Sequence, residues 1–194
     1  MSTKHPPERP NFSALEAAAS HTVEQRKPIL ALIGDLNFSW SNTESVFIYV
    51  LMLLLETDDV SAAIVFSTLN TTRSRLDLIQ RLARAKLQNT DTLQDLEKII
   101  IEFSKVTATR NDLNHATFVF NAKGEITHTQ SLKLQEKRGK MQFGSLNVLD
   151  DKRIAQIGQV VQDVKSLNRK IWNILPKLDI RSLSLPRACR APIS

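Results

Sequence analysis

Apolar residues recur along most of the chain with the three- to four-residue spacing of helices that bury one face. The densest run, residues 46–55, is apolar on nearly every side, which indicates a helix at the centre of a bundle or in a subunit interface. The pattern predicts helices over residues 28–38, 42–56, 59–87, 93–116 and 151–175.

Local signals suggest where these helices begin and end. Ser41, with Glu44 three residues later, forms a capping box directly before the apolar run, and predicts the start of a helix there. Pro28 suits the first turn of a helix, and Pro176 is expected to end the last one.

A different pattern follows His115. Residues 118–120 and 126–129 flank a turn that contains Gly124, which predicts a β-hairpin, and residues 137–140 mark a second, shorter one. We therefore expect an all-α fold, an up-and-down bundle of about five helices, with a small β-hairpin insertion before the last long helix.

The expected domain organisation has three parts. Residues 1–27 form a flexible N-terminal arm, and residues 28–175 form one helical domain whose β insertion covers about 117–145. Residues 176–194 form a basic tail rich in proline and arginine.

Composition narrows the function classes. The 194 residues are 42% hydrophobic, enough for a core, and Cys189 is the only cysteine, which excludes an internal disulfide and a multi-cysteine zinc site. The longest apolar run is shorter than the roughly 20 residues of a membrane span. The first residues are polar and proline-rich, unlike a secretory signal. We expect a cytoplasmic protein without membrane association.

The formal net charge of +6 suggests nucleic-acid binding, but it is unevenly distributed. Residues 176–194 hold four Lys or Arg and one Asp, a net +3, whereas residues 28–175 carry only +2. The expected folded body is nearly neutral, so overall charge does not require a basic surface.

Polar residues continue the buried stripe of the helix predicted over 93–116. At 100° per residue from Leu96, Arg110 lies at about −40° and Asn114 at about 0°, in line with the apolar residues before them. Asn111 and His115, four residues apart, are neighbours beside that stripe. Unpaired buried polar groups cost about 1–3 kcal/mol each, so these residues need partners or solvent.

Two arrangements satisfy this requirement. In one, the helix end leaves the core, and its polar residues cap the helix, meet water or form ion pairs, as Arg110 would with Glu44 or another acid. In the other, the stripe lines a cleft where a guanidinium, two amides and an imidazole converge. An arginine fork matches a phosphate, and a histidine can move a proton to or from a 2′-hydroxyl or a leaving oxygen. That set suits phosphodiester cleavage in RNA. His115 has no Cys or His partner nearby, so the sequence does not indicate a metal site.

The segment Arg110-Asn111-Asp112-Leu113-Asn114-His115 resembles the signature of the HEPN superfamily (higher eukaryotes and prokaryotes nucleotide-binding domains), an Arg followed by four to six residues and a His. The resemblance covers about residues 40–175. It implies metal-independent RNA cleavage without a cofactor, with His115 as general acid/base, Arg110 on the scissile phosphate and Asn111 in support. It also implies a homodimer with facing motif helices.

Other residues are candidates for supporting roles. Asn114 and the upstream acid Glu44 would support the site, and Arg73 and Arg75 would contact RNA unless they form an ordinary solvated helix face. The sequence thus predicts a metal-independent endoribonuclease in defence, stress response or a toxin–antitoxin pair. Its expected partners are RNA, a second copy and an antitoxin or inhibitor protein. The alternatives are a non-catalytic HEPN-like module that binds RNA, a nucleotide or a protein, and a purely structural helical dimer.

Overall fold

The structure is a computed structural model of the whole chain. It describes residues 9, 11–21, 23–121, 123–131, 133–137 and 139–178. The first eight residues of the expected arm, most of the expected basic tail and Cys189 lie outside the described residues.

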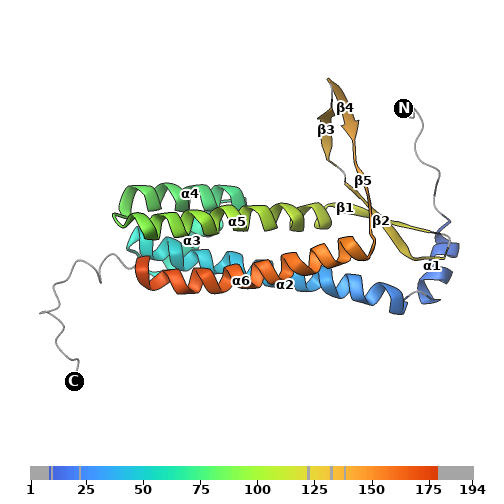
Figure 1. The fold of residues 1–194 in the computed structure, drawn as a ribbon, viewed down its shortest axis with the longest axis horizontal. Coiled ribbons are helices and arrows are strands. Elements are labelled where there is room, and N and C mark those ends of the chain that lie inside the picture. Colours follow the sequence, from blue (N-terminus) through green and yellow to red (C-terminus); the bar gives the residue numbers. More distant parts are fainter. Residues whose placement is uncertain are drawn as a thin grey trace, which may run out of the picture. The chain divides into compact units, whose positions relative to one another are not determined.

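Helices dominate the fold, and a small β region precedes the last helix (Figure 1). The described helices are α1 (Phe12–His21), α2 (Val23–Leu55), α3 (Asp59–Thr68), α4 (Thr72–Lys86), α5 (Thr90–Asn114) and α6 (Asp151–Leu178). The predicted class, a helical bundle with a β insertion before its last helix, is confirmed.

Helix α2 is continuous, so the predicted helix start at Ser41 is wrong. The polar residues there do not cap a helix; they satisfy carbonyls one turn back. Thr43 Oγ1 donates to the Ser39 carbonyl at 2.8 Å, and Ser45 Oγ donates to the Ser41 carbonyl at 2.9 Å. Trp40 and Thr43 are buried, so the apolar contacts of the helix continue through the polar segment.

The expected arm contains helical residues, and the helical turn expected around Ala14–Ala19 falls within α1. Residues 12–21 form α1, and α2 begins at Val23, five residues before Pro28. Proline is tolerated near the start of a helix, where few backbone N–H groups have an internal partner.

Helices α3 and α4 are separate, although the pattern predicts one helix over 59–87. Asp58 caps α3 by accepting from the Ser61 N–H at 2.8 Å, and Thr71 caps α4 by accepting from the Ser74 N–H at 3.1 Å. The buried residues of α3 are Ala62 and Phe66.

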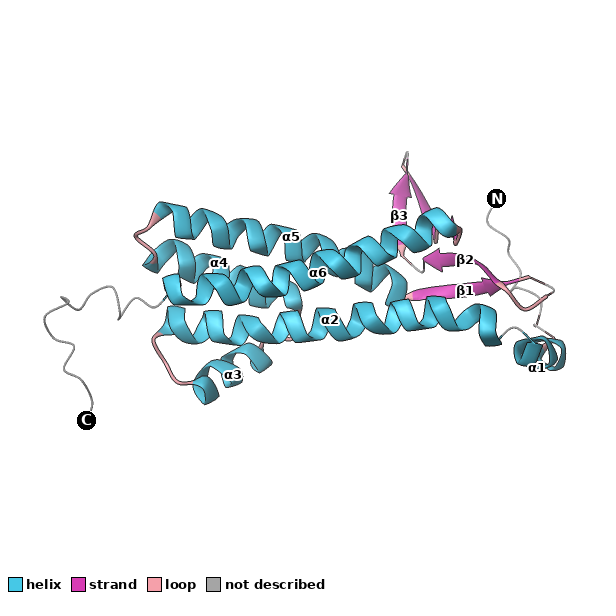
Figure 2. Ribbon diagram, turned by 60° about the horizontal axis from the view of Figure 1, so that its bottom comes forward, coloured by secondary structure: helices cyan, strands magenta, loops and turns pink. Residues whose placement is uncertain are grey.

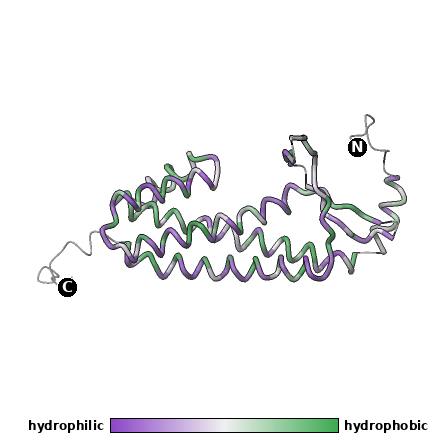
Figure 3. The backbone as a smooth tube through the Cα atoms, turned by 45° about the horizontal axis from the view of Figure 1, so that its top comes forward, coloured by the Kyte–Doolittle hydropathy of each residue, from purple (hydrophilic) through white to green (hydrophobic). Residues whose placement is uncertain are grey.

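Helix α6 begins as predicted but ends later. Asp150 caps it by accepting from the Arg153 N–H at 2.8 Å. The helix continues past Pro176 to Leu178, which is fully buried. Its buried residues recur every three or four positions, from Ile157 to Leu178. The coloured tube in Figure 3 shows apolar and polar residues alternating along the long helices.

The two predicted hairpins are present (Figure 2). Strands β1 (Ala116–Phe120) and β2 (Ile126–Ser131) are antiparallel around Gly124, whose φ is +78°. Strands β3 (Leu134–Lys137) and β4 (Lys140–Phe143) form the second hairpin. The pattern missed β5 (Leu146–Val148), which pairs with β2 and completes a three-stranded sheet in the order β1-β2-β5.

The chain divides into two compact units rather than one domain with an insertion. One unit, the sheet unit, contains residues 1–34 and 111–158; the other, the bundle unit, contains residues 35–110 and 159–194. Helices α2, α5 and α6 each contribute residues to both units. In the bundle unit, fully buried side chains such as Phe47, Phe103 and Ile171 form the core.

One described helical stretch, Arg26–Leu55, is long and apolar enough to cross a membrane. Half of its most apolar window is buried inside the protein, which a core helix also shows. The cytoplasmic location therefore stays a prediction.

Candidate functional site

The Arg110–His115 motif lies at the C-terminal end of α5. His115 is the first residue beyond the helix, and its N–H donates to the Asn111 carbonyl at 3.0 Å. Strand β1 begins at the next residue. The division of the chain falls within the motif, since Arg110 belongs to the bundle unit and the five residues after it belong to the sheet unit.

Two residues of α2 hold the Arg110 side chain. Its Nε–H donates to Asn37 Oδ1 at 2.9 Å, and its guanidinium carbon lies 4.3 Å from the ring centroid of Trp40. A guanidinium over an indole face gains a cation–π attraction, which is strongest where water is partly excluded. Arg110 is half-buried, so these contacts restrict its orientation without covering it completely.

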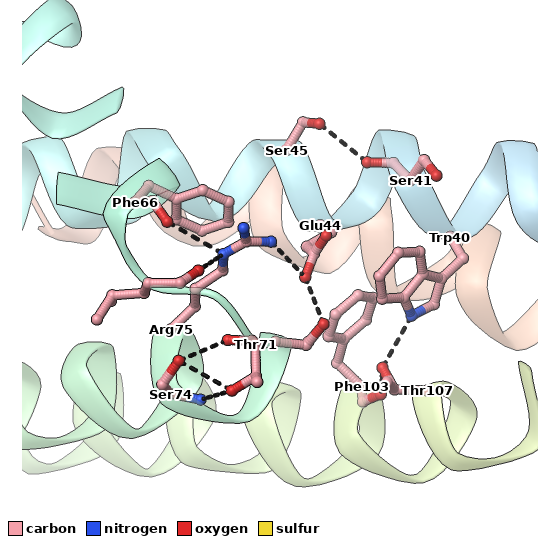
Figure 4. A network of polar contacts seen from close by, with 12 residues as sticks. Trp40, Ser41, Glu44, Ser45, Phe66, Thr71, Ser74, Arg75, Phe103 and Thr107 are labelled. Atoms are coloured by element: carbon pink, nitrogen blue, oxygen red, sulfur yellow. Dashed lines mark hydrogen bonds and ion pairs between the residues drawn. The ribbon is translucent and has the colours of Figure 1, made fainter. Parts of the chain in front are cut away.

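The Trp40 indole is itself held by Thr107 and Phe103 of α5 (Figure 4). Trp40 is 6% exposed, and its Nε1–H donates to Thr107 Oγ1 at 2.8 Å. Thr107 Oγ1 in turn donates to the Phe103 carbonyl at 2.7 Å, and the ring of Phe103 stacks on Trp40 with centroids 5.9 Å apart. Trp40 therefore serves as a rigid platform between α2 and α5.

The other motif residues differ in exposure. Asn111 is half-buried, whereas Asn114 and His115 are exposed. The predicted inward position of Asn114 is therefore wrong. Leu113, at about −100° from Leu96, is buried in its place, because the buried face of α5 changes direction in its last turn.

Glu44 does not pair with Arg110. Its Oε1 lies 3.1 Å from Nη1 of Arg75 (Figure 4). The same oxygen accepts from the Thr72 hydroxyl at 2.6 Å. The Arg75 and Glu44 side chains are 21% and 13% exposed, so the ion pair is largely removed from solvent. The structure places Glu44 in an α2–α4 connection.

Arg75 has further partners inside the bundle unit. Its Nε–H is shared by the carbonyls of Phe66 and Leu69, at 3.1 and 3.0 Å, and its guanidinium carbon lies 4.5 Å from the centroid of the Phe66 ring. These contacts tie the C-terminal end of α3 to α4. Arg75 thus connects elements of the bundle unit, whereas Arg73, the other predicted RNA contact, is exposed.

Asp35, five residues before Trp40 on α2, is a second charged residue with fixed partners. Lys165 Nζ donates to Asp35 Oδ2 at 2.9 Å, and Ser39 Oγ donates to Asp35 Oδ1 at 3.2 Å. The hydrogen bond from Lys165, helped by that from Ser39, lowers the pKa of Asp35 against the opposing effect of desolvation. This pair joins α2 to α6 within the bundle unit.

Sequence reasoning missed the partners of Arg110. Asn37 and Trp40 lie one helical turn apart on α2, but the pattern placed a helix break between 38 and 42, which hid their shared face. Thr107 follows the buried Val106 on α5 and is itself buried, although its polar side chain does not predict burial.

Comparisons with known proteins add no relative. No family model, no curated protein and no solved structure matches the chain. The HEPN resemblance therefore rests on the residues of the motif and their place in a helical fold. Among the described residues, no group of three or more His, Cys, Asp or Glu side chains gathers as metal ligands would.

Proposed function

We propose that the protein is a metal-independent endoribonuclease of HEPN type. The observation that supports this proposal is the restricted orientation of the Arg110 side chain. Its half-buried guanidinium contacts Trp40 and Asn37, and the motif ends at the exposed His115. A cation with a restricted orientation is suited to binding a phosphate, because little side-chain entropy is lost on contact.

The proposed reaction is an internal transfer on the RNA chain. His115 accepts the proton of a ribose 2′-hydroxyl, and the 2′-oxygen attacks the adjacent phosphorus. As that bond forms, the bond to the 5′-oxygen breaks, and this oxygen takes a proton from a second acid. The products are a 2′,3′-cyclic phosphate and a 5′-hydroxyl. Arg110 stabilises the charge that develops on the phosphate oxygens.

A homodimer supplies the second acid in this proposal, since two motifs facing each other bring two histidines to one phosphate. Sedimentation equilibrium tests this part separately. A dimer at micromolar concentration supports it, and a monomer at every concentration tested contradicts it.

RNA cleavage in EDTA tests the proposal. The wild-type protein and its His115→Ala and His128→Ala variants are incubated with a labelled mixed-sequence RNA. His128 lies on β2, so its variant removes one imidazole outside the motif. We expect cleavage by the wild type and by His128→Ala, and a loss of about 10²–10⁴-fold in His115→Ala. Absence of cleavage by the wild type, or an unchanged rate in His115→Ala, contradicts the proposal.

The second candidate function is a non-catalytic module that binds RNA, a nucleotide or a protein. It is favoured by the low charge of residues 28–175, because a ribonuclease commonly concentrates cations where the phosphate chain lies. Salt-dependent RNA binding without turnover supports this candidate over the first. The toxin–antitoxin or defence setting and an inhibitor partner belong to the first candidate and depend on its test.

A further inference from the structure

A cavity of about 550 Å³ opens within the sheet unit. Its walls come from the end of α5, from strands β2 and β5 with the loop before β5, and from the first two turns of α6. All of its lining residues lie between Asp112 and Gln156, within one continuous segment of the sheet unit. Asp112 and Leu113 of the motif segment line it, but neither Arg110 nor His115 does, so we call this the α6 cavity and treat it apart from those two residues.

The α6 cavity is lined largely by hydrogen-bonding groups. Its sheet side is lined by Thr129, Ser131, Ser145 and Asn147, whose side chains carry a hydroxyl or an amide. Its volume lies in the range of about 300–1,000 Å³ that small-molecule sites occupy. A lining of this kind suits a polar ligand with several hydrogen-bond acceptors.

The negatively charged residues that line the cavity have partners, whereas two of the positively charged ones form no ion pair among the described residues. Lys133 pairs with Asp112, and Asp150 caps α6 by accepting from the Arg153 N–H at 2.8 Å. Both lining carboxylates thus have partners. Lys152 and Arg153 take part in none of the ion pairs found between described residues, so the remaining charge at the cavity is positive.

Arg153 also has a buried N–H donor without an acceptor among the described residues. Its Nη1 donates to Gln156 Oε1 at 3.3 Å, a long contact, while its Nε is buried and meets no acceptor in the described part of the chain. A buried donor without an acceptor costs about 1–3 kcal/mol, which a suitable ligand recovers after a small rotation of the side chain. The forked guanidinium fits two oxygens of a phosphate, and the positive end of the α6 dipole favours the same charge.

We propose that the α6 cavity is a phosphate-binding site for a nucleotide or for an RNA terminus. Arg153 makes the forked contact with the phosphate, Lys152 adds a second positive charge, and the hydroxyls on the sheet side bind the remaining oxygens or the sugar. The site extends beyond the proposed catalytic motif and does not depend on it.

Calorimetric titration of the full chain with three probes tests the site. The probes are inorganic phosphate, adenosine 5′-monophosphate and a short RNA with a 5′-phosphate, each at low and moderate salt. A site for free nucleotides gives the tightest binding with the monophosphate. A site for an RNA terminus gives the tightest binding with the phosphorylated RNA, and a loss of affinity when its 5′-phosphate is removed. If none of the probes binds at millimolar concentration, the proposal is overturned.

Variants locate the binding. Arg153→Gln is expected to weaken it about tenfold or more, because a charged hydrogen bond is lost. Lys152→Gln, at an exposed position, is expected to weaken it about threefold and tests the site even if Arg153→Gln does not fold. The matched control is Arg169→Gln, which removes one exposed arginine farther along the same helix and is expected to leave affinity unchanged.

The outcomes separate this site from the motif. His115→Ala is expected to retain phosphate binding whether or not the protein cleaves RNA, so failure of the nuclease proposal leaves this test intact. Equal weakening in Arg153→Gln and Arg169→Gln means that binding follows net charge, and overturns the proposed site. Loss of binding in His115→Ala also overturns it, since the ligand then occupies the motif.

Discussion

Arg110 lies over the face of Trp40, with its guanidinium carbon 4.3 Å from the ring centroid, and this contact joins α5 to α2. The contact has a structural and a functional side. It shields part of a cation inside a helical bundle, and it restricts the directions in which that cation can meet a phosphate. Variants of the two α2 residues that hold Arg110 separate these effects.

Asn37→Ala removes the acceptor of the Arg110 Nε–H. Asn37 is half-buried, so we expect a loss of stability of only about 1 kcal/mol. If Arg110 binds the scissile phosphate, the variant lowers kcat for RNA cleavage about tenfold with a smaller change in KM, because the cation loses its orientation. Asn37→Asp keeps an acceptor and is expected to restore much of the rate. An unchanged kcat in Asn37→Ala assigns Asn37 a structural role only.

Trp40→Phe keeps an aromatic face under Arg110 but removes the Nε1–H that bonds Thr107. We expect a loss of about 1–2 kcal/mol in urea unfolding, from the lost hydrogen bond to Thr107 Oγ1 and the smaller ring. Trp40→Leu also loses the cation–π contact and is expected to cost about 1 kcal/mol more. Equal stability of the two variants means that the ring face contributes nothing to holding Arg110.

Much of the fold follows from patterns that are local in the sequence. The hairpins are marked by Gly124 and Gly139, and the stripes of α5 and α6 are long enough to show the helical period. The continuity of α2 was not predictable in this way, because serine, threonine and asparagine around residue 41 favour caps as readily as they bond helix carbonyls.

The candidate site was predictable only in part. The motif places Arg110 and His115 at a helix end from sequence alone. The partner of Arg110 is 73 residues away, and no periodicity relates Asn37 to that arginine. Likewise Glu44 was a reasonable partner for Arg110 by charge, but Arg75 reaches it from α4, and that choice depends on how the helices pack.

Breaking the Glu44–Arg75 ion pair tests its structural role. Because the pair is mostly screened from water, Glu44→Gln is expected to lower the free energy of unfolding by about 2 kcal/mol, and Arg75→Met by a similar amount. The double variant is expected to cost clearly less than the two single costs together. The cycle is read from urea unfolding, with Arg73→Met, at an exposed position of the same helix, as the control. Additive losses mean that the two groups do not interact.

Asp58 makes the start of α3 sensitive to pH. The Ser61 backbone N–H, and then the Ser61 hydroxyl, bond to the carboxylate and lower the pKa of Asp58. A lowered pKa in the folded state means that the stabilisation is present above the unfolded pKa, about 3.9, and is lost as the pH falls below it. Asp58→Asn keeps an acceptor at the cap but cannot titrate, so we expect its stability to change less than that of the wild type between pH 5 and pH 2.5. Identical pH profiles contradict this role.

Gly144 and Gly139 form a matched pair for testing the sheet unit. Both have positive φ, +74° and +70°, so an alanine is strained at either position. They differ in their surroundings, because a Cβ at Gly144 would lie 2.7 Å from the Ser131 carbonyl oxygen, whereas one at Gly139 would meet nothing within 4 Å.

Gly139→Ala is therefore expected to cost about 1 kcal/mol, from backbone strain alone. Gly144→Ala is expected to cost at least about 1 kcal/mol more, because the oxygen at the end of β2 must move away from the new methyl group. The displacement also alters the wall of the α6 cavity, to which Ser131 and Ser145 belong, so phosphate binding there should weaken in Gly144→Ala and persist in Gly139→Ala. Urea unfolding and calorimetry measure the two effects separately. Equal stability of the two variants rules out the close approach at Ser131.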